Sequence, residues 1–216
     1  MAVQFPANRR QPNRSAALAQ YRRRADSYDR ELQLFEPIRG EAIACLDLHR
    51  GETVLDVGCG TGLSFELLHD RLGKGGRIVG IEQCPEMLAK ARERVAANHW
   101  HHIDLVNAPA ATARIPVQAD AALFHFTHDI LREPTAIANV LAHLKPGARV
   151  VASGLQWAPP WAWPTNGFVM LAALYSVTSL EGLGKPWDLL ASHLADVQVQ
   201  HTMLGGIYIA SGRYMH

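Results

Sequence analysis

The sequence predicts an α/β fold: a doubly wound sheet of seven strands, mostly parallel, that ends in an antiparallel hairpin. Three observations support this fold class. Short apolar strand patterns alternate with helical patterns between residues 53 and 153, a glycine-rich turn follows the first strand, and two strand patterns flank Gly205-Gly206 near the end. Alternating strands and helices require a parallel sheet covered on both faces, whereas a tight glycine turn joins antiparallel neighbours.

Length and composition fit one globular domain. With 216 residues, of which 48% are apolar, the chain can bury one full core. We therefore expect a single domain over residues 1–216. Its parts are a loose arm (1–14), N-terminal helices (15–48), a core that carries the glycine turn (49–153), an insertion (154–195) and a terminal hairpin (196–216).

The individual elements follow from periodicity and turn residues. Apolar positions at helical spacing from Ser15 to Asp47 predict helices that are divided at Pro37. Further helices are expected at 63–71, 85–98, 134–144 and 167–180. Strands are expected at 53–57, 77–81, 103–107, 119–124, 148–153, 197–203 and 207–214, with Lys145-Pro146-Gly147 as a turn.

The charge balance gives no global reason to expect a nucleic acid or an acidic partner. The formal net charge is +1, although the first thirty residues are locally basic. The arginines of this segment are Arg9, Arg10, Arg14, Arg22, Arg23, Arg24 and Arg30. A solvated helix face explains them more simply than a binding surface does.

Cysteine usage indicates a reducing compartment, and we expect the cytoplasm. Cys45, Cys59 and Cys84 are too few and too scattered for a disulfide framework or a zinc cluster. Residues 1–14 are polar and lack the apolar centre that an export signal requires. No charged residue occurs between Arg149 and Glu181, but the prolines of this stretch leave room only for a helix too short to cross a bilayer.

The glycine turn is the first sign of a ligand site. Gly58, Gly60 and Gly62 allow a ligand to approach the backbone closely, and the next helix start offers unpaired N–H groups. A dinucleotide fingerprint needs a further glycine three residues after the second, and Leu63 or Phe65 occupies that place. The spacing therefore argues against a pyrophosphate ligand.

An acidic residue follows at the distance that a ribose requires. Glu82 lies twenty residues beyond Gly62, at the tip of the second expected strand. A carboxylate at this place can accept hydrogen bonds from both hydroxyls of a ribose held over the glycine turn.

Taken together, these motifs resemble the class I S-adenosylmethionine-dependent methyltransferase family, in its subgroup of quinone and small-molecule methylases. The resemblance rests on Val54 to Leu63, Ile78 to Glu82 with Pro85 to Leu88, Ala119 to Leu123, and Leu144 to Ala148. It covers residues 15 to 153 and the final hairpin, and implies a Rossmann-like fold with S-adenosylmethionine as cofactor.

The resemblance also implies roles for single residues. Asp56 and the glycine turn hold the methionine end, Glu82 binds the ribose, and Gln83 and Met87 pack against the adenine. Tyr28 belongs to a segment that folds across the cofactor, and His125 lies beside the sulfonium. Many relatives place an aspartate against the adenine edge where this chain has Pro109, so backbone groups at Ala108 and Ala110, or the side chain of Asn107, are expected to replace it.

The segment after the fourth strand offers candidates for catalysis. His128 or Asp129 could take a proton from an attacking hydroxyl, while packing of His128 and helix capping by Asp129 explain the same residues. The segment lacks the Asn/Asp-Pro-Pro-aromatic motif of methylases that act on nucleic-acid bases, so no nucleic-acid partner is expected. The attacked atom (O, N, S or C) stays open. A separate cluster consists of His99, His101 and His102 with nearby Asp104, but consecutive histidines at a turn point in diverging directions, and no metal site is expected.

The insertion is rich in aromatic residues that suit a small, largely apolar or aromatic acceptor. We expect Trp157, Trp161, Trp163 and Phe168 to line one wall of a dry cavity, with Tyr21 on the other. Core packing explains many of these aromatics equally well. Three rival functions remain: a phospholipid methyltransferase in peripheral contact with a membrane, an NAD(P)-dependent reductase, and a non-enzymatic lipid-binding module.

Overall fold

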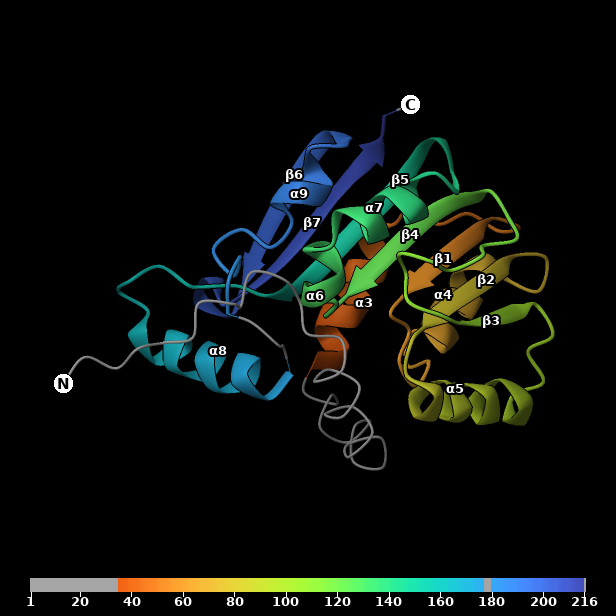
Figure 1. Ribbon diagram of the computed structural model, residues 1–216, viewed down its shortest axis with the longest axis horizontal. Helices are drawn as coiled ribbons and strands as arrows, with labels where there is room; N and C mark the ends of the chain where they lie inside the picture. The colour runs from red at the N-terminus through yellow and green to blue at the C-terminus, as the bar shows by residue number, and fades with distance from the viewer. Residues whose placement is uncertain (1–34, 177–179, 216) are drawn as a thin grey trace.

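The computed structural model describes residues 35–176 and 180–215, whose strands form one seven-stranded sheet flanked by helices (Figure 1). The strand order is β3-β2-β1-β4-β5-β7-β6. The strands are β1 (Thr53–Val57), β2 (Arg77–Glu82), β3 (Ile103–Asn107), β4 (Ala119–His125), β5 (Leu144–Leu155), β6 (Leu194–Thr202) and β7 (Ile207–Tyr214). The helices are α3 (Glu36–Cys45), α4 (Phe65–Leu72), α5 (Pro85–Ala97), α6 (His128–Leu131), α7 (Pro134–Leu141), α8 (Trp163–Ser176) and α9 (Asp188–Ala191), with a 3₁₀ turn η2 (Met203–Gly205).

The sheet topology confirms the predicted fold class. The pairs β1–β2, β2–β3, β1–β4 and β4–β5 are parallel, and β7 is antiparallel to both β5 and β6. The strand order reverses at β1, which lies between β2 and β4. In such sheets ligands bind outside the carboxyl ends of the strands at the point of reversal. The glycine turn after β1 therefore lies where the topology places a ligand.

Two apolar cores cover the two faces of the sheet. Along β1 the side chains alternate between them: Val54 joins the core shared with α3, α4 and α5, and Leu55 joins the core shared with α7. Both residues are fully buried. This double coverage explains why the strands read as nearly continuous apolar runs.

Several expected boundaries were wrong. Strand β6 begins at Leu194 rather than at 197. Lys145-Pro146-Gly147 is part of β5, because Leu144 already pairs with Ala119 and a register shift absorbs the irregular backbone, with Gly147 at φ 76°. The helix expected to reach residue 144 ends at Leu141 for the same reason. Helix α8 begins at Trp163 rather than at 167, since Pro164 stands in the first turn, where a missing N–H costs nothing.

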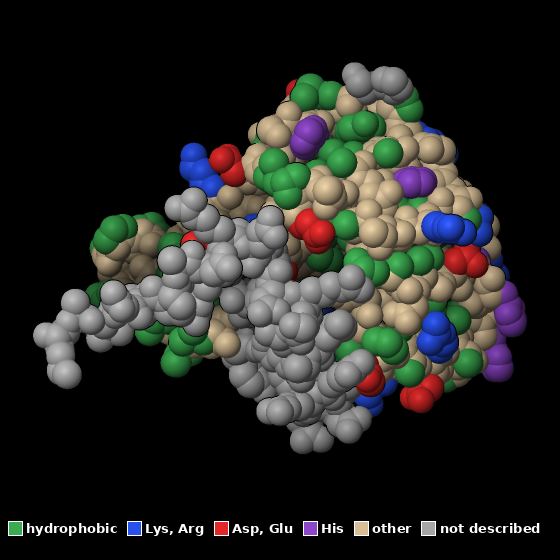
Figure 2. All heavy atoms as spheres, in the orientation of Figure 1, with side chains coloured by type: hydrophobic (Ala, Val, Ile, Leu, Met, Phe, Trp, Pro, Cys, Tyr) green, Lys and Arg blue, Asp and Glu red, His purple; other side chains and the backbone are tan. Residues whose placement is uncertain are grey.

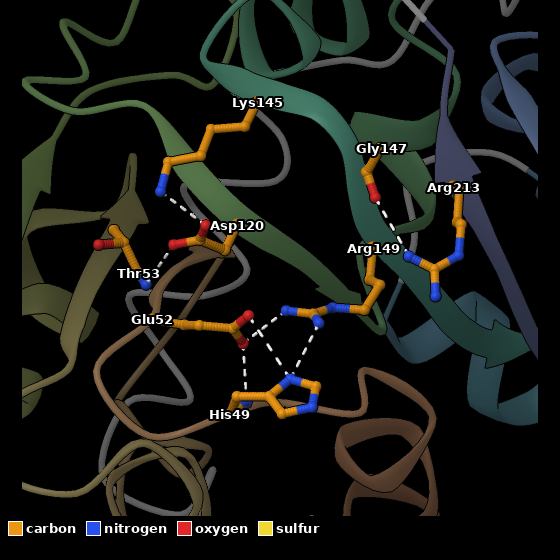
Figure 3. Close-up of polar contacts among 8 residues, drawn as sticks. All are labelled: His49, Glu52, Thr53, Asp120, Lys145, Gly147, Arg149 and Arg213. Carbon is orange, nitrogen blue, oxygen red and sulfur yellow. Dashed lines mark hydrogen bonds and ion pairs between the residues drawn. The ribbon is translucent and has the colours of Figure 1, made fainter.

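A polar network ties the amino ends of three strands together, opposite the glycine turn (Figure 3). Asp120 on β4 accepts hydrogen bonds from the backbone N–H of Thr53 at 2.9 Å and from Lys145 Nζ at 2.6 Å. Arg149 on β5 pairs with Glu52, which precedes β1. Burial alone would raise the pKa of the Glu52 carboxyl, but the hydrogen bond from Arg149 and its charge lower it overall. These contacts fix the register of the sheet without touching the site.

No helix in the described ranges is both long and apolar enough to cross a membrane.

Candidate functional site

The glycine turn adopts a backbone that only glycine accepts readily. Gly58, Gly60 and Gly62 have φ values of 73°, 58° and 78°. A Cβ on Gly58 would lie 2.6 Å from the Thr127 side chain, and one on Gly62 would lie 2.5 Å from the ring of Phe65. The N–H groups of Gly58 and Cys59 both donate to the carbonyl of Ile81, at 2.8 and 3.0 Å. The turn is thus fixed against the end of β2.

Glu82, the predicted ribose ligand, lies across the glycine turn. Its carboxylate accepts hydrogen bonds from the backbone N–H groups of Gly60 at 3.1 Å and of Cys84 at 2.7 Å. Burial raises the pKa of this carboxyl even though these N–H groups act in the opposite direction. Each carboxylate oxygen keeps further acceptor capacity, so the group can still receive hydroxyl protons.

Asp56 and Arg39 bring opposite charges into the small cavity over the turn. Both side chains are 2% exposed, and both line this cavity together with His125 and Phe126. Asp56 Oδ2 and Arg39 Nε are buried without a hydrogen-bond partner among the described residues. Burial raises the pKa of Asp56 to about 7; Arg39 lowers it and Glu82 adds to the rise. Arg39 also pairs with Glu36.

Two more polar groups face the same region. His125 Nδ1 lies 2.7 Å from Ser153 Oγ, while its Nε2 and the hydroxyl of Thr127 are buried without partners among the described residues. Burial, with the charge of Arg39, holds the pKa of His125 well below its usual value, so its ring is neutral. Buried polar atoms normally have partners, and a group of them around one cavity indicates a ligand.

The cavity residues fit the methionine end of the implied cofactor. A carboxylate and a guanidinium with unused buried atoms complement the ammonium and the carboxylate of an amino acid. The enclosed volume is about 20 Å³, which is smaller than a nucleoside. A larger, open groove of about 410 Å³ lies between residues 112–116 and α7, and it contains none of the predicted site residues.

The expected adenine side lies at the ends of β2 and β3. Met87 is 1% exposed, and Gln83, four residues before it in sequence, is half-buried. Asn139 on α7 donates to the carbonyls of Ala110 at 2.7 Å and Ala113 at 3.0 Å, and so fixes the loop after β3. Asn107 Nδ2 donates to the carbonyl of Glu82 at 2.9 Å. Asn139 was not predicted.

His128 connects α6 to the segment that follows α8. Its Nε2 lies 2.9 Å from the carbonyl of Glu181, which can only accept, so Nε2 carries the proton. The Glu181 carboxylate in turn accepts from Arg132 at 2.9 Å. A role as base would therefore fall to Nδ1 of His128. The catalytic roles of His128 and Asp129 stay predictions.

On the expected acceptor side, a row of aromatic rings runs from the glycine turn to α8. The ring centroids of Phe126 and Phe35 are 5.0 Å apart, and those of Phe35 and Phe168 are 6.4 Å apart. Phe126, next to His125, has the unusual φ of 55°, which is strained for a bulky residue. The sequence pointed to Phe168 but not to Phe35 or Phe126 as part of this wall.

The other predicted acceptor residues differ in their burial or lie outside the described residues. Trp157 is half-buried, whereas Trp161 and Trp163 are 70% and 75% exposed, so burial gives no support for a place in the acceptor wall. Tyr21 and Tyr28 lie outside the described residues.

The histidine cluster near β3 is only partly exposed. His99 and His101 are exposed as expected, but His102 Nε2 lies 2.9 Å from His69 Nδ1. Burial, together with His69 and His101, lowers the pKa of His102. Within the ranges that the structure describes, no three His, Cys, Asp or Glu side chains are arranged to hold a metal ion.

Comparison with known proteins identifies a methyltransferase domain in this chain. A family model described as a methyltransferase domain matches residues 54–147, which contain the glycine turn, Glu82 and His128. Trans-aconitate 2-methyltransferase of Variovorax paradoxus (strain S110) is 32% identical over 205 residues, covering 86% of this chain and 71% of that protein. 2-Phytyl-1,4-naphtoquinone methyltransferase of Thermosynechococcus vestitus (strain NIES-2133 / IAM M-273 / BP-1) is 29% identical over 186 residues, covering 77% and 82%.

Solved structures show the same fold. A SAM-dependent methyltransferase from Aquifex aeolicus superposes with a TM-score of 0.53 at 20% identity, covering 78% of this chain and 85% of that one. The chain spans only 54%, 29% and 64% of the length of three further curated relatives, so the activities of those whole proteins are not carried over. By the match to the Variovorax protein and to the domain model, the chain belongs to the class I methyltransferase family, whose cofactor is S-adenosylmethionine.

Proposed function

We propose that this protein transfers a methyl group from S-adenosylmethionine to a small, largely apolar or aromatic acceptor. The observation that carries the proposal is the buried pair of Asp56 and Arg39 over the glycine turn, each with a polar atom that no described residue satisfies. Leaving such atoms unpaired costs free energy, and a zwitterionic amino acid would supply both missing partners.

Each part of the cofactor has a proposed partner in the chain. Asp56 would receive the α-ammonium group, and Arg39 the α-carboxylate. Glu82 would accept from the ribose hydroxyls, while Met87 and Gln83 would pack against the adenine, whose edge would meet backbone groups at Ala108 and Ala110. His125 would lie near the sulfonium, and Tyr28 would belong to the covering segment.

The bound cofactor supplies a methyl group on a positively charged sulfur. The task of the protein is to hold the acceptor in line with that methyl and to keep water away. The neutral ring of His125 suits a site that must not repel a sulfonium. If the acceptor attacks through a hydroxyl, His128 Nδ1 or the Asp129 carboxylate would take its proton.

The aromatic row supports an apolar or aromatic acceptor. Phe126, Phe35 and Phe168 lead from the cavity toward α8, and Trp157 packs against the same core. Two relatives, a 2-phytyl-1,4-naphtoquinone methyltransferase and a trans-aconitate 2-methyltransferase, are named for different small acceptors. The apolar surroundings in this chain favour the quinone-like class over a carboxylic acid.

A reductase function and a nucleic-acid acceptor are both disfavoured. A nicotinamide dinucleotide carries no ammonium group for Asp56 and brings phosphates toward a carboxylate, so a reductase fits poorly. A nucleic acid would need a basic groove with many phosphate contacts, and the acceptor side contains no Lys or Arg between residues 150 and 180. The free thiols of Cys45, Cys59 and Cys84 support the cytoplasm as the proposed location.

The test is a pair of measurements. Calorimetry with S-adenosylmethionine establishes whether the cofactor binds. Incubation with methyl-labelled cofactor and fractionated cell extract then identifies the acceptor fraction. We expect label in a small organic-extractable product; label in nucleic acid would overturn the acceptor class.

A further inference from the structure

Helix α8 has an outer face that is apolar and exposed to solvent. Val169 and Ala173 turn inward and are fully buried. On the opposite side, Trp163, Leu171 and Leu174 are 75%, 68% and 60% exposed. Their spacing places them on one side of the helix, and we call this surface the α8 outer face. Met170 on the same side is 44% exposed, and Trp161 just before the helix is 70% exposed.

The α8 outer face carries no charge. No Asp, Glu, Lys or Arg occurs between Arg149 and Glu181. Helix α8 lies at one end of the molecule, at the left in Figure 1, while Lys, Arg, Asp, Glu and His side chains gather over β1, β2 and β3 at the right in Figure 2. Large apolar side chains that are exposed together on one face of a helix indicate a contact surface.

A basic segment joins the body next to this face. The described chain begins at Phe35, whose ring lies 6.4 Å from that of Phe168 on α8. Residues 1–34, which lead to this point, contain seven arginines and no lysine against two aspartates and one glutamate, a formal charge of +4. The rest of the chain is therefore net acidic, since the whole carries +1. The segment that carries this positive charge is therefore joined to the described chain at Phe35.

We propose that the α8 outer face docks on the surface of an anionic phospholipid bilayer. Tryptophan is enriched at the boundary between lipid chains and headgroups, and apolar helix faces lie in that boundary with basic residues close by. Leu171 and Leu174 enter the acyl region, Trp163 lies at its edge, and the arginines of residues 1–34 attract anionic headgroups. A protein partner would instead call for a polar rim, which this charge-free helix does not offer.

The inference concerns a different surface from the cofactor site and does not require the proposed methyl transfer. None of the residues assigned to the cofactor lies on the α8 outer face. Binding to vesicles can therefore be measured without cofactor or acceptor. If both proposals hold, the row of aromatic rings that ends at Phe168 would lie beside the lipid.

The experiment is co-sedimentation of the full-length protein with vesicles of phosphatidylcholine, with or without phosphatidylglycerol. We expect binding to the anionic vesicles that weakens as salt rises. The double variant Leu171→Gln/Leu174→Gln should bind at least about tenfold more weakly, since it places two amides in the acyl boundary. The matched control is Leu189→Gln/Val197→Gln on α9 and β6, where the side chains are 36% and 39% exposed; it should bind as the wild type does.

Circular dichroism and titration with S-adenosylhomocysteine establish that both variants fold and keep the cofactor site. Wild-type protein that stays in the supernatant with anionic vesicles would overturn the proposal. So would equal binding by the α8 variant and the control. Light scattering tests a third outcome. If the wild-type protein is a dimer that does not bind vesicles, and the Leu171→Gln/Leu174→Gln variant is a monomer, the α8 outer face would instead contact a second copy of the chain.

Discussion

Arg39 on α3 and Asp56 at the end of β1 lie buried together beside the glycine turn, each with 2% of its surface exposed. The guanidinium lowers the pKa of Asp56, but burial outweighs it and holds that pKa at about 7. The two side chains line one cavity without forming an ion pair with each other, and buried charges that are incompletely satisfied add little to stability. Their value to the protein lies in the ligand groups that they can receive.

The affinity for S-adenosylmethionine should depend on pH through Asp56. Below a pKa of about 7 the free protein carries a proton on this carboxyl, and the α-ammonium group can pair only with the ionised form. Binding at pH 6 must therefore release a proton, and affinity should fall by up to about tenfold per pH unit below 7 and level off above it. Calorimetry in buffers of different ionisation enthalpy measures the proton release. Asp56→Asn should abolish both effects; a pH-independent affinity in the wild type would contradict the assignment.

Arg39→Met should weaken binding of S-adenosylhomocysteine by about 1.5–3 kcal/mol, the usual scale for a charge-assisted hydrogen bond. The same variant should bind 5′-methylthioadenosine as tightly as the wild type does, because this nucleoside lacks the amino-acid carboxylate. A thermal shift assay with both ligands makes the comparison. If the variant loses the same binding free energy for both ligands, Arg39 supports the fold of the site rather than binding the ligand's carboxylate.

Glu82→Gln should lower cofactor affinity by a similar amount, about 1.5–3 kcal/mol, because the amide keeps the shape but loses the charge that receives the ribose hydroxyls. The control is Glu93→Gln, at an exposed position of α5 far from the turn in sequence. Fluorescence titration of both variants gives the difference. Since Glu82 also holds the N–H groups of Gly60 and Cys84, a change in melting temperature must be measured alongside. Cofactor affinity that Glu82→Gln leaves unchanged is the result that rules out this site.

Phe168→Ala should raise the acceptor's KM, or lower kcat by misplacing it, while cofactor affinity stays constant. The matched control is Trp163→Ala, since this ring is 75% exposed. Steady-state kinetics with the acceptor found by labelling separates KM from kcat. If Trp163→Ala impairs turnover in solution as much as Phe168→Ala does, the acceptor wall follows the sequence prediction instead of the aromatic row.

The strands and the glycine turn were predictable because their signals are local. The alternation of apolar residues, the glycines at 58, 60 and 62, and Glu82 all lie within one stretch of chain. The start of β5 was not predictable, because Pro146-Gly147 is a turn signal in sequence and becomes a bulge only through the pairing of β5 with β4.

Arg39 was missed because Asp56, the opposite charge that lines the same cavity, lies on another element. Yet α3 contained a usable signal: Arg39, Ala42, Ile43 and Leu46 follow the i, i+3, i+4, i+7 pattern of a buried helix face. An arginine at a core position of such a pattern calls for a charged partner or a ligand. The sequence contains no such signal for the exposure of Trp161 and Trp163. Large aromatic side chains are usually buried, and only the packed structure shows which of them are exposed.

The most direct test of the central claim is a calorimetric titration of the full-length protein with S-adenosylhomocysteine and, separately, with NADPH. The account predicts saturable binding of S-adenosylhomocysteine that Asp56→Asn and Glu82→Gln both weaken, and no measurable binding of NADPH. Binding of NADPH at concentrations where S-adenosylhomocysteine does not bind would contradict it.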